Sequence, residues 1–202
     1  MAIHTPAAIS DALGSTGMGI RARSGSVFYS GRSAFAVEAP LYILGLNPGG
    51  SPERQAAETV EADLEQFGSQ SPDWSAYADE EWEGRPAGTC GMQPRVLHML
   101  ARLNLDPRRV PASNVVFVRS RNEKALQAEK SSLLNACWPV HAAVIDTLRV
   151  RTILCFGGTA GRWTRERVDA HELVDSYSET NLRGWTSVAH RAPDGRVVVT
   201  VT

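Results

Sequence analysis

Four short, mainly apolar runs separated by segments of helical length constrain the fold more than any other feature of the sequence. Unbroken apolar runs of strand length are typical of strands that are covered on both faces. Helical connections between such strands imply that they lie mostly parallel. The sequence therefore predicts an α/β fold, a three-layer α/β/α sandwich with a mostly parallel four-stranded central sheet. The four predicted strands are 41–46 ("LYILGL"), 114–118 ("NVVFV"), 152–156 ("TILCF") and 196–202 ("RVVVTVT").

The segments between these runs carry signals of helices, one hairpin and one long loop. Two apolar runs around Ser30-Gly31 predict a hairpin over 26–37. The stretch 68–91 is rich in Gly, Ser and Pro, and a loop of that length is usually functional or disordered. A short helix is expected after Gly157-Gly158. Longer helices are predicted over 5–13, from a Ser51 N-cap to about Phe67, over 93–104, and over 131–148 with Pro139 as a kink or boundary.

Length and composition indicate an ordinary globular chain without a resident metal or other cofactor. The 202 residues fit a single domain, 1–202. No apolar run reaches the roughly 18 residues that a membrane span needs. The start "MAIHTPAAISDAL" has neither the basic end nor the apolar stretch of a signal peptide, so a cytoplasmic protein is expected. We also expect a monomer. Three cysteines without a CxxC pair argue against a disulfide framework and a zinc site.

The basic residues are almost all arginines, although the net charge is only −1. Nucleic-acid-binding proteins are more often basic, so the overall charge does not indicate one. Of the 21 basic residues, 19 are arginine, with five in 149–167 and six in 95–121. A GC-rich coding sequence explains this usage, and so does a local phosphate-binding patch, because arginine binds phosphate bidentately. Both explanations remain open at this point.

The predicted carboxyl ends of the strands carry polar residues and glycines. In open α/β sheets ligands bind beyond these ends. Pro48 fixes its own φ and moves Asn47 out of the helical region, while Gly49 and Gly50 let backbone amides approach a ligand. A rigidly held asparagine there can position a water molecule. The alternative is a strand-to-helix turn in which Asn and Gly serve conformation alone.

Three stretches resemble the uracil-DNA glycosylase superfamily, in the same order along the chain. "GLNPGG" resembles its first motif, in the G-x-N-P-G form of the mismatch-specific and single-strand-selective branches. "NVVFVRSRN" resembles its second-strand segment, and 135–163 resembles its helix, strand and glycine turn. The resemblance implies hydrolysis of the N-glycosidic bond of a uracil-type or deaminated base that has been flipped out of DNA.

The resemblance also assigns roles to individual residues. Asn47 would hold the attacking water, and the backbone from Leu46 through Pro48 to Gly49 would help to read the base. One of Tyr77, Trp82 or Trp74 would supply the aromatic platform, although packing within the loop explains each of them equally well. The residues that would contact DNA phosphates are Arg119, Arg121, Gly158 and Arg162.

The sequence departs from the superfamily pattern at two places. Members carry an asparagine at the end of the second strand, where the predicted register puts Ser120; a slip of two residues would offer Asn122 on the same face. Serine cannot make the paired contacts of an amide. The superfamily's His-Pro-Ser turn follows the fourth strand, where this chain ends at Thr202. His190 precedes that strand and is expected at the opposite edge. We therefore expect either a shortened form of a longer protein or a member without full activity.

Two other functional classes remain open. One is a non-catalytic domain on the same fold that binds a nucleic acid or a nucleotide-like small molecule. The other is an unrelated doubly wound small-molecule enzyme. Cys137 lies where the superfamily's iron–sulfur branch has a ligand, but three cysteines cannot form a four-thiolate cluster. Cys137 and Cys155 are expected as buried apolar residues, and His98 and His141 as helix residues without a catalytic role.

Overall fold

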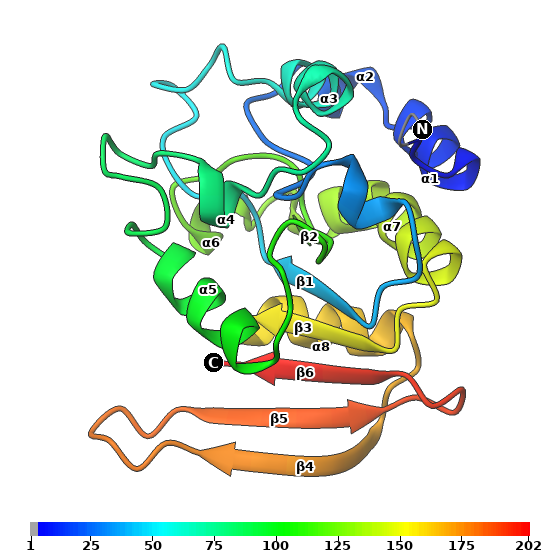
Figure 1. Ribbon diagram of the computed structural model, residues 1–202, viewed down its shortest axis with the longest axis vertical. Helices are drawn as coiled ribbons and strands as arrows, with labels where there is room; N and C mark the ends of the chain where they lie inside the picture. The colour runs from blue at the N-terminus through cyan, green and yellow to red at the C-terminus, as the bar shows by residue number, and fades with distance from the viewer. Residues whose placement is uncertain (1–3) are drawn as a thin grey trace.

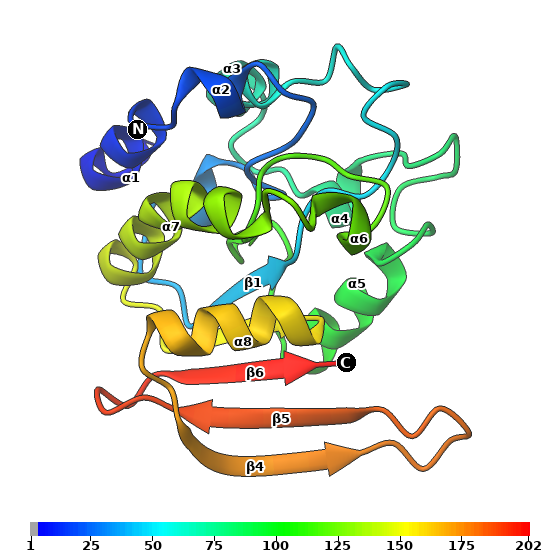
Figure 2. The ribbon, with the colours of Figure 1, turned by 180° about the vertical axis from the view of Figure 1, so that it is seen from behind.

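The central element of the fold is a six-stranded mixed sheet with helices on both faces (Figures 1 and 2). The computed structural model describes residues 4–202. The strand order is β2-β1-β3-β6-β5-β4, in which β2, β1, β3 and β6 are parallel and β5 and β4 continue the sheet antiparallel. The strands are β1 (Leu41–Gly45), β2 (Ala112–Asn114), β3 (Thr152–Phe156), β4 (Glu172–Ser178), β5 (Thr186–Arg191) and β6 (Val197–Val201).

The prediction of an α/β fold is confirmed, but the prediction of a four-stranded sheet is wrong. The predicted strands 41–46 and 152–156 are the inner strands β1 and β3. A hairpin of β4 and β5 extends the sheet beyond β6. Most of β4 is exposed, so its sequence "ELVDSYS" contains no apolar run. Leu173 and Tyr177 are exposed on it. A strand that no helix covers lacks the continuous apolar pattern by which its neighbours were recognised.

The helices predicted over 5–13, 93–104 and 131–148 are confirmed, and Pro139 lies inside the last of them. The helix predicted from Ser51 is wrong over its first half. Residues 51–59 form turns, and the helix begins only after Thr59, whose Oγ1 accepts a hydrogen bond from the amide of Ala62. The helices are α1 (Ala7–Gly14), α2 (Met18–Arg21), η1 (Arg32–Phe35), α3 (Val60–Ser69), α4 (Ala76–Asp79), α5 (Gln93–Arg102), α6 (Glu123–Leu126), α7 (Lys130–Thr147) and α8 (Gly158–Arg167).

Two further segments differ from their predictions. The segment 26–37 is not a hairpin: it pairs with β2 and with the long loop through single bridges, and then forms the 3-10 helix η1. The second strand ends at Asn114, whereas 114–118 was predicted. Residues 115–118 are fully buried, but they bend out of the sheet, which explains why their apolar run resembles a strand. This shift moves the expected carboxyl end of β2 by several residues.

The core lies on both faces of the parallel strands. On β1, Tyr42 and Leu44 pack on the side of α7, whereas Leu41 and Ile43 pack on the side of α5. Figure 2 shows α7 and α8 in front of the sheet, and Figure 1 shows α5 on its other side. Cys137 and Cys155 are buried, as predicted. None of the helices within 4–202 is long and apolar enough to cross a membrane.

Candidate functional site

The carboxyl ends of the four parallel strands meet at one edge of the sheet. Gly45 of β1 lies beside Asn114 of β2, and Phe156 of β3 lies beside Val201 of β6. The loops that follow β1 and β3 therefore lie at this edge, which is where ligands bind in such sheets. His190 pairs with Val198 near the start of β6, at the opposite end of the strands, as predicted.

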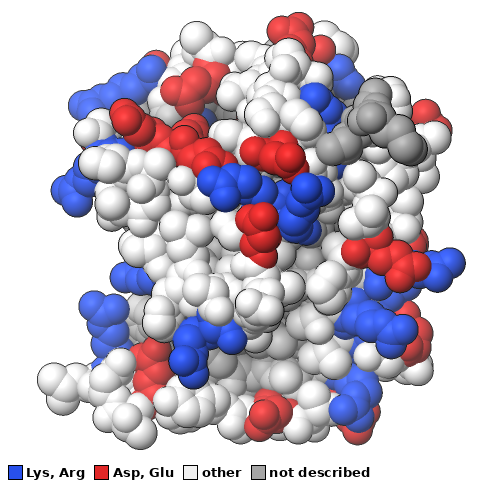
Figure 3. Space-filling model, in the orientation of Figure 1, with Lys and Arg blue, Asp and Glu red and all other residues white. Residues whose placement is uncertain are grey.

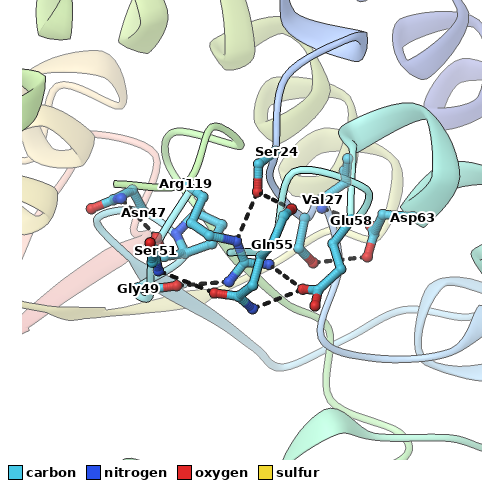
Figure 4. Close-up of polar contacts among 11 residues, drawn as sticks. Ser24, Val27, Asn47, Gly49, Ser51, Gln55, Glu58, Asp63 and Arg119 are labelled. Carbon is cyan, nitrogen blue, oxygen red and sulfur yellow. Dashed lines mark hydrogen bonds and ion pairs between the residues drawn. The ribbon is translucent and has the colours of Figure 1, made fainter. Parts of the chain in front are cut away.

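Asn47 lies in the loop after β1, and its side chain is held by its nitrogen. Nδ2 donates to the carbonyl of Pro48 and to Ser120 Oγ, both at 2.9 Å. The carboxamide oxygen accepts no hydrogen bond from residues 4–202 and points away from the polar network in Figure 4. The two hydrogen bonds that Nδ2 donates fix the orientation of the carboxamide. Its oxygen therefore presents an acceptor in a defined position. Such an acceptor can hold and polarise a water molecule.

The two residues considered for base reading after β2 have structural partners. Ser120 is buried; its Oγ donates to the carbonyl of Asn122 at 2.9 Å and accepts from Asn47. The Asn122 side chain caps α6 through a hydrogen bond from the amide of Ala125 at 3.0 Å. The structure brings Ser120 to Asn47 as an orienting contact, and it directs Asn122 to a helix end.

Asn114, which the sequence reasoning missed, occupies the end of β2. It is buried, and its Oδ1 lies only 2.2 Å from the position that a Cβ on Gly45 would take, so glycine is required opposite it. The Asn114 side chain lies near the hydroxyl of Tyr29, and burial raises the pKa of that hydroxyl to about 12. A side-chain amide, which can both donate and accept hydrogen bonds, therefore lies at the end of β2. Asn114 pairs with Gly45, which is two residues before Asn47.

An aromatic cluster borders a cavity of about 840 Å³, whose lining includes Gly49 but neither Asn47 nor Asn114. Tyr29 stacks on Tyr77 with ring centroids 5.8 Å apart, and Trp82 packs edge-on against Tyr29 at 6.3 Å. Tyr77 is buried behind this pair, whereas Tyr29, Trp82 and Trp74 line the cavity together with Gly49. A cavity of this size accommodates a small organic ligand. Of the aromatics expected as a platform, Trp82 and Trp74 face this space, and Tyr29 joins them.

Arg119 braces the loop that carries Gly49 (Figure 4). Its guanidinium donates to the Gly49 carbonyl at 2.7 Å, to Ser24 Oγ at 3.1 Å and to Glu58 at 2.9 Å. The side chain is only 11% exposed. A guanidinium with three internal partners has little capacity left for a phosphate. Of the other residues expected to contact phosphate, Arg121 is exposed and pairs with Glu53, and Gly158 and Arg162 are exposed on the first turns of α8.

Carboxylates dominate the charged lining of the cavity. Asp63 accepts hydrogen bonds from the Val27 amide at 2.7 Å and from Ser26 Oγ at 2.9 Å, and burial raises its pKa to about 6. Burial also raises the pKa of Glu80. On the face shown in Figure 3, positive and negative side chains are interspersed. The cavity is lined by Glu58, Asp63, Glu80, Glu81 and Glu83 against Arg85 and Arg119.

The charge and chemistry of the cavity favour a neutral or cationic group over a phosphate, because the carboxylates outnumber the arginines. Within residues 4–202, no group of three or more His, Cys, Asp or Glu side chains is placed to hold a metal ion. No protein-family model and no curated protein matches the chain. Its function is therefore inferred from the geometry at the edge of the sheet.

Proposed function

We propose that the protein is a DNA N-glycosylase, which hydrolyses the bond between the sugar and a uracil-type or deaminated base flipped out of the strand. The observation that carries the proposal is the arrangement of Asn47: its nitrogen is fixed by Pro48 and Ser120, and its oxygen accepts no hydrogen bond within the described residues, 4–202. Four parallel strands with helices on both faces support the α/β/α sandwich that the superfamily resemblance implies.

In the proposed reaction, Asn47 Oδ1 accepts a hydrogen bond from a water molecule and directs its oxygen at C1′ of the sugar. A C1′–O bond forms as the bond from C1′ to the base nitrogen breaks. One water proton is lost from the new hydroxyl, and a proton is taken up by the departing base. The protein contributes a fixed water position, which converts a bimolecular encounter into an oriented one.

Asn114 is the residue that we propose reads the base edge. The superfamily resemblance expects an amide at the end of the second strand, and β2 ends at Asn114 rather than at Ser120. The neighbouring Tyr29, together with Trp82, provides an aromatic wall against which a base can stack. The acidic lining is compatible with a neutral base inside the cavity, with the phosphates outside it.

The test is an excision assay on single- and double-stranded oligonucleotides that carry uracil, hypoxanthine or xanthine. Low salt is required because phosphate contacts weaken steeply with ion concentration. Alkali-induced strand scission is expected for the wild type, and a loss of about 100-fold or more for Asn47→Ala. Asn135→Ala is the matched control, because Asn135 is an exposed asparagine on α7. Full activity of Asn47→Ala would refute the assigned role.

A second candidate, a non-catalytic domain that binds a nucleoside-like small molecule, is favoured by the acidic lining of the cavity and by the internal bonds of Arg119. Calorimetric titration with free nucleosides separates the two. Binding that Trp82→Ala weakens, in a protein that excises none of the three bases, would select this candidate.

A further inference from the structure

A second cavity, of about 1130 Å³, lies between α5 and the tip of the β4–β5 hairpin. We call residues 179–185 the hairpin tip and this cavity the tip groove. Phe156 and Val201, at the carboxyl ends of β3 and β6, line the groove, as does Met99 of α5. The hairpin tip forms the remaining wall and projects from the body at the lower left of Figure 1. The groove therefore lies along the same edge of the sheet as Asn47.

The hairpin tip has a defined shape that presents apolar side chains to solvent. The Glu179 amide donates to the Trp185 carbonyl at 2.8 Å, and Asn181 Oδ1 accepts from the amides of Arg183 and Gly184 at 2.9 and 3.2 Å. Leu182 is completely exposed, and Trp185 is 48% exposed. Large apolar side chains that stabilise no core, but are held on a braced turn, are typical of a contact surface.

The charges around the groove are those of a site for a polyanion. The Arg183 guanidinium lies 5.1 Å from the centre of the Trp185 ring. Neither Arg95 nor Arg183 forms an ion pair with any carboxylate in 4–202, whereas Glu179 accepts a hydrogen bond from Asn181 at 2.8 Å. An aromatic ring with flanking arginines on an apolar floor is the combination that binds single-stranded nucleic acid, through base stacking and phosphate contacts.

We propose that the tip groove binds single-stranded DNA, with a base stacked on Trp185 and phosphates at Arg95 and Arg183. The choice of DNA rests on the proposed function, but binding requires no cleavage. Strands β1 and β6 are two strands apart, about 10 Å at the usual spacing. This distance corresponds to about three nucleotides at duplex rise. A strand whose target base occupies the Asn47 site thus reaches the groove a few nucleotides away.

The test measures the fluorescence anisotropy of a labelled, lesion-free oligothymidylate of about 12 nucleotides. We expect Trp185→Ala to raise the Kd about 5- to 150-fold, the range for loss of one stacking contact. Tyr177→Ala is the matched control, because Tyr177 is an aromatic on the same hairpin, 65% exposed, and does not line the groove. Arg95→Gln and Arg183→Gln should each reduce the slope of log K against log salt by about 0.7.

The proposal is overturned if the wild type does not bind the oligonucleotide, or if Trp185→Ala binds as tightly as the wild type. It is also overturned if Trp185→Ala converts a dimer into a monomer in sedimentation velocity, because a second copy would then cover the groove. Binding that depends on Trp185, without excision of any base, would remove the proposed glycosylase function and leave this inference standing.

Discussion

A histidine buried in α7 should make a destabilising contribution to the fold as the pH is lowered. His141 is 0% exposed, and its Nδ1 lies 2.8 Å from the hydroxyl of Tyr42. Its Nε2 has no hydrogen-bond partner in 4–202. The other rings around it, Phe117 and Trp138, offer no compensating charge. Burial therefore lowers the pKa of His141 from 6.5 to about 4.

The sign and the size of the effect follow from this pKa. Between pH 6.5 and pH 4 the unfolded chain binds a proton at His141 and the folded protein does not, so the free energy of unfolding falls as the pH is lowered. At about 1.4 kcal/mol for each pH unit, the loss approaches about 3 kcal/mol near pH 4. Asp63 acts in the opposite direction, because its pKa is raised in the folded protein and acid favours its protonated form.

Urea denaturation followed by circular dichroism at a series of pH values measures this loss. His141→Asn keeps a polar group near the Tyr42 hydroxyl but does not titrate, so Asp63 contributes equally to both proteins. The variant is expected to be less stable at pH 7, because a smaller side chain leaves a cavity. The difference between the two proteins should shrink by about 3 kcal/mol from pH 7 to pH 4. Parallel curves over this range would refute the reasoning.

Two further predictions concern the loop after β1 and the packing of α8. Arg119→Met removes three hydrogen bonds and should lower the free energy of unfolding, measured in urea, by about 1–3 kcal/mol. Hydrogen exchange in the loop should become faster. The control Arg121→Met, at an exposed ion pair, should change the free energy of unfolding by less than about 0.5 kcal/mol. Gly161→Ala should cost about 1–3 kcal/mol, because its Cβ would lie 2.1 Å from Thr200 Oγ1 and 2.7 Å from the Thr200 Cβ. Gly158→Ala on the same helix, with its nearest atom at 3.9 Å, should not destabilise, and equal thermal shifts for both alanines would contradict this.

The inner strands could be predicted from the sequence because packing on both faces leaves a continuous apolar run. Strands β1 and β3 satisfy this condition, and their predicted starts are confirmed. Strand β4 does not, because its residues are mostly exposed and no apolar pattern distinguishes them from a loop. A continuous apolar run reports burial rather than strand geometry. For this reason the run that predicted the second strand also included the buried bend at 115–118.

Of the candidate site, only the part that is local in sequence could be predicted. Asn47 and its glycines occur within one turn, so their relation to β1 could be inferred directly. Asn114 and Tyr29 come together through pairing between segments that are remote in sequence. The extended apolar run hid the end of β2, and the incorrect hairpin over 26–37 hid Tyr29. The surroundings of Asn114 and the hydrogen bonds of Arg119 depend on these long-range contacts, which no local pattern specifies.

The edge position of β4 has a consequence for the behaviour of the protein in concentrated solution. The outer side of β2 is paired with Phe28, whereas β4 is the last strand at the other end of the sheet and most of its side chains face solvent. An uncovered strand edge is a template for pairing with another molecule, and charged side chains oppose this. Glu172 and Asp175 supply that charge here. Colloidal stability should therefore fall when these carboxylates are neutralised, and a storage buffer well above the isoelectric point of about 6.5 should keep the protein in solution.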